Sequence, residues 1–253
     1  MTTPARPARE AWFGGNRHGE QWSGGKSLDA SIPRYGDANL ADGSPAPTNV
    51  VLLHREVFTD VAAADVDGFV AAVAGNAVAG TFELTLDGAL VVAGVGVNDV
   101  PRVVEVTVTH GSAVVAGTFR VTGTDALGYT ITEDLAITAG GTTKTATTLQ
   151  AFATVTSVQE IIAADASANT NIVGNADVLG LSRILENTEF VRLELEDGAL
   201  ATAGTIVVGA APVGPADGRG TYLPNSTPNG ALDFEVFFWV TDPDRAFVGQ
   251  IVI

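Results

Sequence analysis

Apolar and polar side chains alternate strictly over residues 104–109 of the segment RVVEVTVT (102–109) and over residues 191–196 of the segment FVRLELEDG (190–198). Because side chains of a strand point alternately to its two faces, both segments are predicted to be strands with one buried face. The residues expected to face inward are Val104, Val106, Val108, Val191, Leu193 and Leu195. The residues expected to face solvent are Glu105, Thr107, Thr109, Arg192, Glu194 and Glu196.

Similar short runs recur along the chain and predict further strands. They are GTFELTL (80–86), GTFRVTG (117–123), YTITEDLAIT (129–138), TIVVGA (205–210) and LDFEVFFWV (232–240). Asp87-Gly88 and Asp197-Gly198 follow strand-like runs and predict tight hairpin turns. Short strands separated by Gly-, Asp- and Asn-rich turns indicate an all-β fold, mainly an antiparallel β-sandwich or barrel. Residues 59–75 fit a helix or a buried ribbon; we favour a short helix there and expect at most one short helix in the fold.

The first 47 residues have a different pattern. They contain five of the eleven prolines, and their apolar residues are isolated, with neither a helical nor a strand period. We therefore expect an extended N-terminal arm over residues 1–47 and a β-rich body over 48–253, which is long enough for one sizeable β domain or two β subdomains.

Charge is unevenly distributed between these two parts. The net charge is −16; residues 1–36 contain five basic and three acidic residues, a balance of +2, so the remainder carries 8 − 26 = −18. Such a surface repels nucleic-acid phosphates and anionic membrane faces, so we expect neither direct nucleic-acid binding nor membrane binding. No run is long and apolar enough to cross a bilayer, and the beginning MTTPARPAREAW lacks the apolar core of a secretion signal.

Residues able to perform chemistry form no recognisable motif. Cysteine is absent, which excludes disulfides and cysteine-bound metals. His18, His54 and His110 are far apart in sequence, and no serine-nucleophile motif occurs. The acidic segments DVDG (65–68) and TDPD (241–244) suggest calcium, but neither completes a calcium loop. We therefore expect no catalysis, no cofactor and no metal.

Aromatic side chains point instead to binding of a partner protein. Trp12, Phe13 and Trp22 lie in a segment that cannot bury them by its own folding, and they either anchor the arm to another subunit, which we favour, or pack back on the body. In LDFEVFFWV the second face of the strand carries Phe237 and Trp239, which indicates burial between sheets or, as the alternative, an oligomer contact. The predicted partner-binding residues are Trp12, Phe13, Arg17, Trp22, Tyr35, Phe237 and Trp239.

Two segments resemble proteins of tailed bacteriophage virions. Residues 219–240, RGTYLPNSTPNGALDFEVFFWV, are similar to the closing segment of such proteins, and residues 121–158 resemble a β module of head-decoration proteins. The resemblance implies a capsid decoration (cement) protein, without catalysis, that binds and stabilises the capsid shell. It further implies that the N-terminal arm bridges major capsid subunits, that the protein forms a homotrimer, and that it lies on the outer capsid surface after assembly in the host cytoplasm.

Two other functions are compatible with the same residues. A tail-tube, baseplate or fibre-base protein shares the β pattern and would assemble on the tail. A carbohydrate-binding β-sandwich module would use its aromatic side chains as a sugar platform, with paired carboxylates if it also cleaved the sugar.

Overall fold

The computed structural model describes residues 52–185, 187–209 and 219–240, and the predicted arm over residues 1–47 lies outside these ranges. The described chain is made of antiparallel strands, which confirms the predicted all-β class. The strands are β1 (Leu52–Phe58), β2 (Val70–Ala74), β3 (Gly80–Glu83), β4 (Val91–Val92), β5 (Val95–His110), β6 (Gly117–Thr124), β7 (Thr130–Ile137), β8 (Thr143–Ile162), β9 (Asn169–Gly180), β10 (Val191–Glu196), β11 (Ala199–Leu200), β12 (Thr205–Val207), β13 (Thr221–Leu223) and β14 (Phe234–Val240). A 3-10 turn, η2 (Thr188–Phe190), precedes β10.

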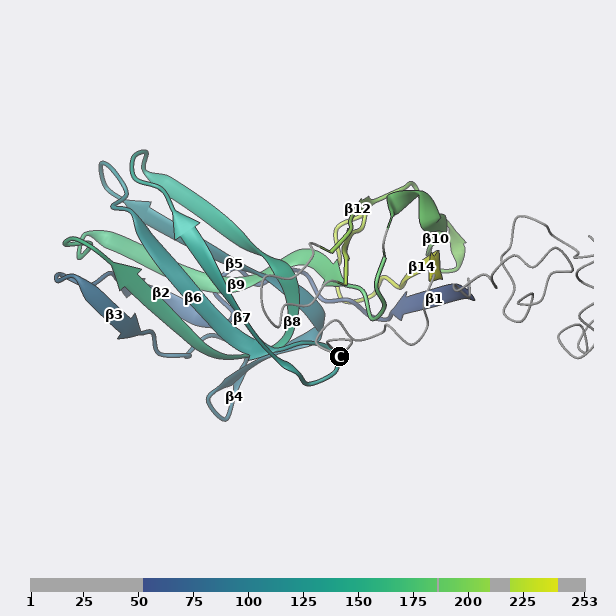
Figure 1. The fold of residues 1–253 in the computed structure, drawn as a ribbon, viewed down its shortest axis with the longest axis horizontal. Helices are drawn as coiled ribbons and strands as arrows, with labels where there is room; N and C mark the ends of the chain where they lie inside the picture. Colours follow the sequence, from purple (N-terminus) through teal and green to yellow (C-terminus); the bar gives the residue numbers. More distant parts are fainter. Residues whose placement is uncertain (1–51, 186, 210–218, 241–253) are drawn as a thin grey trace, which may run out of the picture.

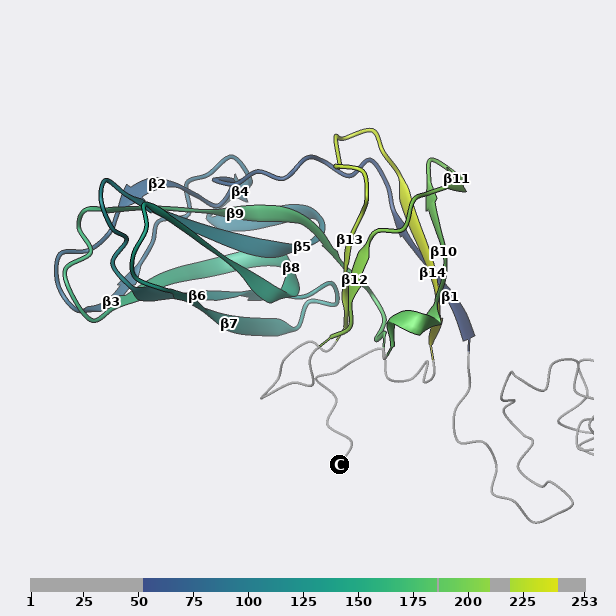
Figure 2. The ribbon, with the colours of Figure 1, turned by 90° about the horizontal axis from the view of Figure 1, so that it is seen from above.

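The strands form two sheets (Figure 1). The large sheet has the order β12-β13-β9-β5-β8-β6-β7, with β2 paired to β9, β3 to β8 and β4 to β5. The small sheet has the order β1-β14-β10-β11. The large sheet curls on itself, and the small sheet stands beyond its β12–β13 end in both views (Figure 2). Within the described ranges, no helix is long and apolar enough to span a membrane.

Two hydrophobic clusters hold this framework together. The first lies inside the curled large sheet and includes Val104, Val106 and Val108, all fully buried as the alternation predicts. The second joins the inner face of the small sheet to Leu179 of β9 and Tyr222 of β13. Because this second cluster spans both sheets, their packing is continuous; a division of residues 48–253 into two β subdomains stays a prediction.

Strand β10 contradicts part of the predicted alternation. Its pairing with β14 shifts between Val191 and Leu193, a β-bulge, so Val191 lies opposite Phe238 whereas Leu193 lies opposite Phe237. The extra residue reverses the faces of the strand beyond it. Leu193 and Leu195 therefore face outward, and Glu194 and Glu196 face inward.

The contacts of Glu194 agree with an inward-facing side chain. Its carboxylate accepts a hydrogen bond from the backbone N–H of Gly204 at 2.7 Å. Burial, followed by the charge of Glu194 and a hydrogen bond to it, raises the pKa of the Tyr222 phenol. The carboxylate thus lies against the buried tyrosine of the neighbouring sheet.

Of the two predicted hairpin turns, one is confirmed. Asp197-Gly198 joins β10 to β11, and both residues have the positive φ (50° and 74°) that a type I′ turn needs. The other prediction is wrong, because the hairpin between β4 and β5 is made by Ala93-Gly94, with φ of 52° and 80°. The backbone N–H groups of Asp87 and Gly88 instead donate to the carbonyl of Phe69, each at 3.1 Å.

The short helix expected over residues 59–75 is also wrong. Residues 59–69 form an irregular loop, and the segment ends in strand β2, which pairs with β9. Side-chain oxygens of Asp99, Asp177 and Asn175 accept hydrogen bonds from backbone N–H groups of this loop. These bonds replace the ones that a helix would form within itself.

We predict that two neighbouring phenylalanines of β14 differ strongly in their effect on stability. Phe238→Ala should lower the free energy of unfolding by about 3–5 kcal/mol, because the side chain is fully buried and leaves a cavity. Phe237→Ala, on the half-buried outer side, should cost less than about 1.5 kcal/mol. Denaturant unfolding of dilute protein measures both changes, and equal losses would contradict the described facing of β14.

Candidate functional site: a buried arginine clamp and an apolar sheet face

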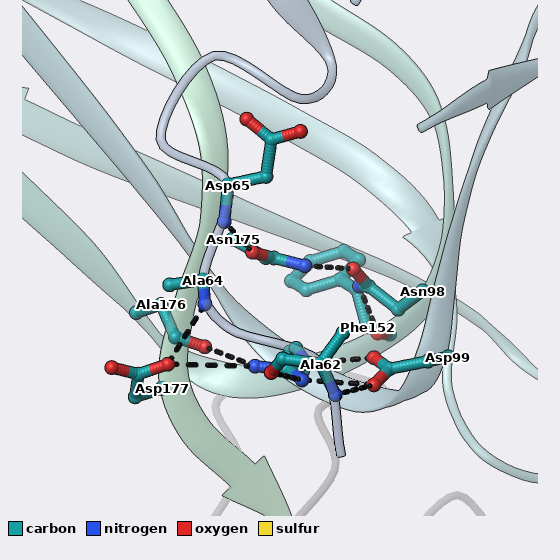
Figure 3. Close-up of polar contacts among 10 residues, drawn as sticks. Ala62, Ala64, Asp65, Asn98, Asp99, Phe152, Asn175, Ala176 and Asp177 are labelled. Carbon is teal, nitrogen blue, oxygen red and sulfur yellow. Dashed lines mark hydrogen bonds and ion pairs between the residues drawn. The ribbon is translucent and has the colours of Figure 1, made fainter. Parts of the chain in front are cut away.

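A fully buried arginine lies where the chain passes from the small sheet to the large one. Arg102 of β5 donates from Nε and Nη2 to the two carboxylate oxygens of Asp99, at 2.7 and 2.9 Å. It also donates to the carbonyl oxygens of Ala62, at 2.5 Å, and Ala176, at 3.4 Å. The carboxylate of Asp177 lies 3.7 Å from Nη1 (Figure 3). One guanidinium thus joins β5, β9 and the loop of residues 59–69.

The two carboxylates around this arginine also bind the loop. Asp99 accepts a hydrogen bond from the N–H of Ala62 at 2.8 Å, and Asp177 accepts one from the N–H of Ala64 at 2.9 Å. Burial alone would raise the pKa of Asp99, but the hydrogen bonds from Arg102 and from backbone N–H groups outweigh it and lower that pKa. Asp99 is therefore ionised at neutral pH, as a partner of a buried cation should be.

A pair of buried asparagines continues the network. Asn175 donates to Asn98 Oδ1 at 2.8 Å, and Asn98 donates to the carbonyl of Phe152 at 2.8 Å. Asn175 Oδ1 accepts the N–H of Asp65 at 2.7 Å. The loop backbone lies so close to β9 that a Cβ at Gly174 would be 1.9 Å from the Asp65 carbonyl oxygen. We call the set of Arg102, Asp99, Asp177, Asn98 and Asn175 the clamp.

The chemistry of the clamp is structural. Its guanidinium is fully buried and bonded to protein oxygens, so it holds elements together and presents no charge to a ligand. The Asp65 carboxyl points away from the clamp in Figure 3, and its pKa is raised by burial and by its neighbour Asp67. Among the described residues, no group of three or more acidic or histidine side chains is placed to hold a metal ion. The DVDG segment therefore offers only a carboxylate pair, and TDPD (241–244) lies outside the described residues.

A second polar cluster was not predicted from the sequence. Glu56 Oε2 accepts bonds from the Ser182 hydroxyl at 2.5 Å and the Ser182 N–H at 2.9 Å, and it lies 3.1 Å from His54 Nε2. The residue types are those of a hydrolase triad, but the same ring nitrogen faces both Glu56 and the serine hydroxyl, which is 3.3 Å away. A triad needs the imidazole between the two, with one nitrogen for each. This cluster instead fastens β1 to the chain that follows β9.

The other histidines have simpler surroundings or lie outside the described chain. His110 Nδ1 accepts bonds from the N–H groups of Ser112 and Ala113, at 2.9 and 3.0 Å, and so closes the turn after β5. His18 belongs to the residues outside the description.

The outward side of the small sheet carries apolar side chains on all four of its strands. We call this surface the outer face; the cross-strand pairs place on it Leu53, Arg55 and Val57 of β1, Glu235, Phe237 and Trp239 of β14, Leu193 and Leu195 of β10, and Leu200 of β11. Leu200 is 77% exposed and Leu53 is 52% exposed. The inner face of the same sheet is buried in the second hydrophobic cluster.

The charges of the outer face differ from those of the whole chain. Arg55 donates to Glu235 at 2.8 Å and lies 5.9 Å from the ring centroid of Phe237. The Arg55 guanidinium lowers the pKa of Glu235. Arg192 lies 5.9 Å from the ring centroid of Trp239, and within the described chain no carboxylate is paired with it. The face thus holds two arginines and one glutamate on a chain whose net charge is −16.

Two of the seven predicted partner-binding residues, Phe237 and Trp239, lie together on this face, each beneath a guanidinium. Their role in binding stays a prediction. The other five, Trp12, Phe13, Arg17, Trp22 and Tyr35, lie outside the described residues. The leucines of β10 and β11 were not predicted as part of such a face, because only the bulge in β10 turns them outward.

We predict that Arg102→Met lowers the free energy of unfolding by about 3–5 kcal/mol, because it leaves buried carboxylate and carbonyl oxygens without their donor. Arg120→Met is the matched control, since Arg120 makes a similar two-bond contact with Asp134 on the surface and should change stability little. Chemical denaturation compares the two, and similar losses for both variants would exclude a special role of the buried clamp.

The same substitution should change the response to pH. The pKa of Asp99 in the folded protein is below its unfolded value of about 3.9. The ionised carboxylate therefore contributes fully to the free energy of unfolding above that pH, and this contribution is lost as pH falls through the folded pKa. In Arg102→Met, burial without the cation should raise this pKa, and protonation then relieves the buried charge. The stability difference between wild type and variant should be largest at neutral pH and should narrow below about pH 4. A difference that is constant from pH 7 to pH 3, measured by denaturation, would contradict this.

Comparison of the chain with protein-family models, with curated proteins and with solved structures found no match in any of the three. The function is therefore argued from the residues and their arrangement.

Proposed function

We propose that this protein is a non-catalytic structural component of a tailed-bacteriophage virion. In this proposal it binds the outer surface of the capsid shell, and its N-terminal arm bridges major capsid subunits. The observation that carries the proposal is the outer face of the small sheet. A surface on which aromatic and branched apolar side chains lie side by side across four strands is characteristic of a protein contact, whereas single scattered apolar residues are ordinary.

The framework behind this face supports an assembly role. The second hydrophobic cluster and the clamp hold the small sheet in one orientation at the end of the large sheet (Figure 2). A rigid surface loses little conformational entropy on binding. On a shell, the same modest contact is repeated at many equivalent positions, and this repetition increases the overall affinity.

The choice of a phage shell comes from the sequence resemblance. One of the two similar segments, residues 219–240, ends in β14 and so contains Phe237 and Trp239 of the outer face. The guanidinium groups over both rings favour a protein partner over a sugar, since a sugar platform needs an open aromatic face. A place on the tail is the alternative location with the same contact chemistry.

The proposal predicts that the full-length protein binds preformed, undecorated capsids and that the outer face is needed. Phe237→Ser/Trp239→Ser should weaken binding at least about tenfold, because both rings lose their contacts. Val92→Ser/Leu149→Ser is the matched control, since these exposed apolar residues lie on the large sheet and should leave binding unchanged. Co-sedimentation measures affinity, and cryo-electron microscopy shows whether regular protrusions appear on the shell.

A deletion of residues 1–40 tests the arm in the same assay. It should abolish shell binding and leave the β-sheet circular dichroism of the body unchanged. Full binding by the deletion variant would remove the arm from the proposal. Bare shells with the wild-type protein would overturn the shell assignment, and immunogold labelling of tails would then favour the tail alternative.

A further inference from the structure

We infer that the outer face of the small sheet binds the segment Glu10–Trp22 of a second copy of this chain, so that neighbouring copies are linked by exchange of their arms. The inference rests on the proposed function in taking the protein to act as assembled copies, and it names the partner of the outer face. The recognition is chemical, between guanidinium–aromatic pairs on the face and glutamate–tryptophan pairs in the arm.

The face presents two such guanidinium–aromatic pairs. Arg192 lies over Trp239 and Arg55 over Phe237, each at 5.9 Å from the ring centroid. Arg55 already has Glu235 as its carboxylate partner, at 2.8 Å. For Arg192 the described chain provides only the aromatic ring. An occupant that fits this face therefore brings apolar rings and at least one carboxylate.

The arm contains this combination twice. Glu10-Ala11-Trp12 and Glu20-Gln21-Trp22 are both of the form Glu-x-Trp, ten residues apart. In an extended backbone, side chains two positions apart point to the same side, so a carboxylate and an indole ring project together. Such a pair can place its ring against the leucines and Trp239 while its carboxylate bonds to the guanidinium of Arg192. The glycines between the two units allow the chain to follow the sheet surface.

Long-range charge also favours this partner. The remainder of the chain carries −18, so two copies repel each other over most of their surfaces. Residues 1–36 carry +2, but the docking segment within them, residues 10–22, has two glutamates against one arginine, whereas the outer face has two arginines against one glutamate. The arm can therefore approach an acidic neighbour, and the face is one of the places where that neighbour offers positive charge to Glu10 and Glu20.

The length of the chain permits a link between copies. From Trp22 to Leu52, where β1 begins, the chain has thirty residue steps, which span up to about 100 Å when extended. The residues between the docked segment and β1 would then cross the shell surface between two copies, where Tyr35 can contact the major capsid protein. This arrangement assigns the two parts of the arm to different partners.

Self-association of the full-length chain, measured by analytical ultracentrifugation, tests the inference. The wild-type protein should form assemblies larger than a monomer, since a head-to-tail contact builds rings or chains. Trp12→Ser/Trp22→Ser in the arm, and separately Leu200→Ser/Trp239→Ser on the face, should each weaken association at least about tenfold. Val92→Ser/Leu149→Ser is the matched control and should associate like the wild type. A monomeric wild-type protein, or association unchanged in either variant pair, would overturn the inference.

Mixing the two deficient variants shows whether the contact is made between copies. The face variant retains a functional arm and the arm variant retains a functional face, so an equimolar mixture should form a one-to-one heterodimer that neither variant forms alone. If each arm instead lay on the face of its own chain, mixing would produce no new species, and the inference would fail.

A charge reversal tests the named pair directly. Arg192→Glu should weaken association, and combination with Glu10→Arg/Glu20→Arg should restore it, which a purely structural role of Arg192 does not predict. Arg120→Glu, at an exposed arginine of the large sheet, is the control. Lack of rescue would contradict the assigned pairing.

Shell binding by a protein that stays monomeric would refute the arm exchange alone, whereas self-association without shell binding would refute only the proposed function.

Discussion

The arrangement of the two sheets depends on one buried guanidinium. Arg102 is bonded at once to a carboxylate of its own strand, to the carbonyl of Ala62 in the connecting loop and to the carbonyl of Ala176 on β9. A buried cation is strongly unfavourable without such partners, so the bonds define a single position for the loop. That loop is the direct connection from β1 of the small sheet to β2 of the large sheet. The clamp therefore fixes the connection to the small sheet, and the second hydrophobic cluster packs that sheet against the large one.

With the small sheet held in this way, its two sides have different roles. The inner side, with Phe234, Val236 and Phe238, is buried against Tyr222 and Leu179 and supplies stability. The outer side has the same apolar character without an equivalent sheet packed on it in the described chain. A strand with apolar side chains on both faces is usual between two layers. Here it produces a surface suited to assembly, and this is the physical basis of both proposals.

Buried polar side chains give the large sheet its particular shape. Asn171 and Asn175 of β9 and Glu160 of β8 are buried at positions where an apolar residue would be expected. Asn175 accepts a hydrogen bond from the loop N–H of Asp65, whereas Glu160 accepts one from the Asn76 side chain and one from Asn171. The bonds to Asp65 and Asn76 hold the loops at the ends of the sheet in place. Stability is therefore sensitive to substitution of these residues, since removal of one partner leaves the other polar group buried without a hydrogen bond. The same reasoning explains the large effect expected for Arg102→Met.

The local sequence pattern was sufficient to predict the class of fold, the inward-facing valines of β5 and the Asp197-Gly198 turn, because strand periodicity and turn geometry depend on adjacent residues. The sequence by itself also singled out Phe237 and Trp239 as unusual. It did not reveal the loop over residues 59–69, whose N–H groups are satisfied by side chains more than thirty residues away. Nor did it reveal that Leu193 and Leu195 face outward, since a single extra residue in β10 reverses the alternation. The outer face and the clamp were decided only by the tertiary structure, because both are built from strands that are distant in sequence and whose register is set by their partners.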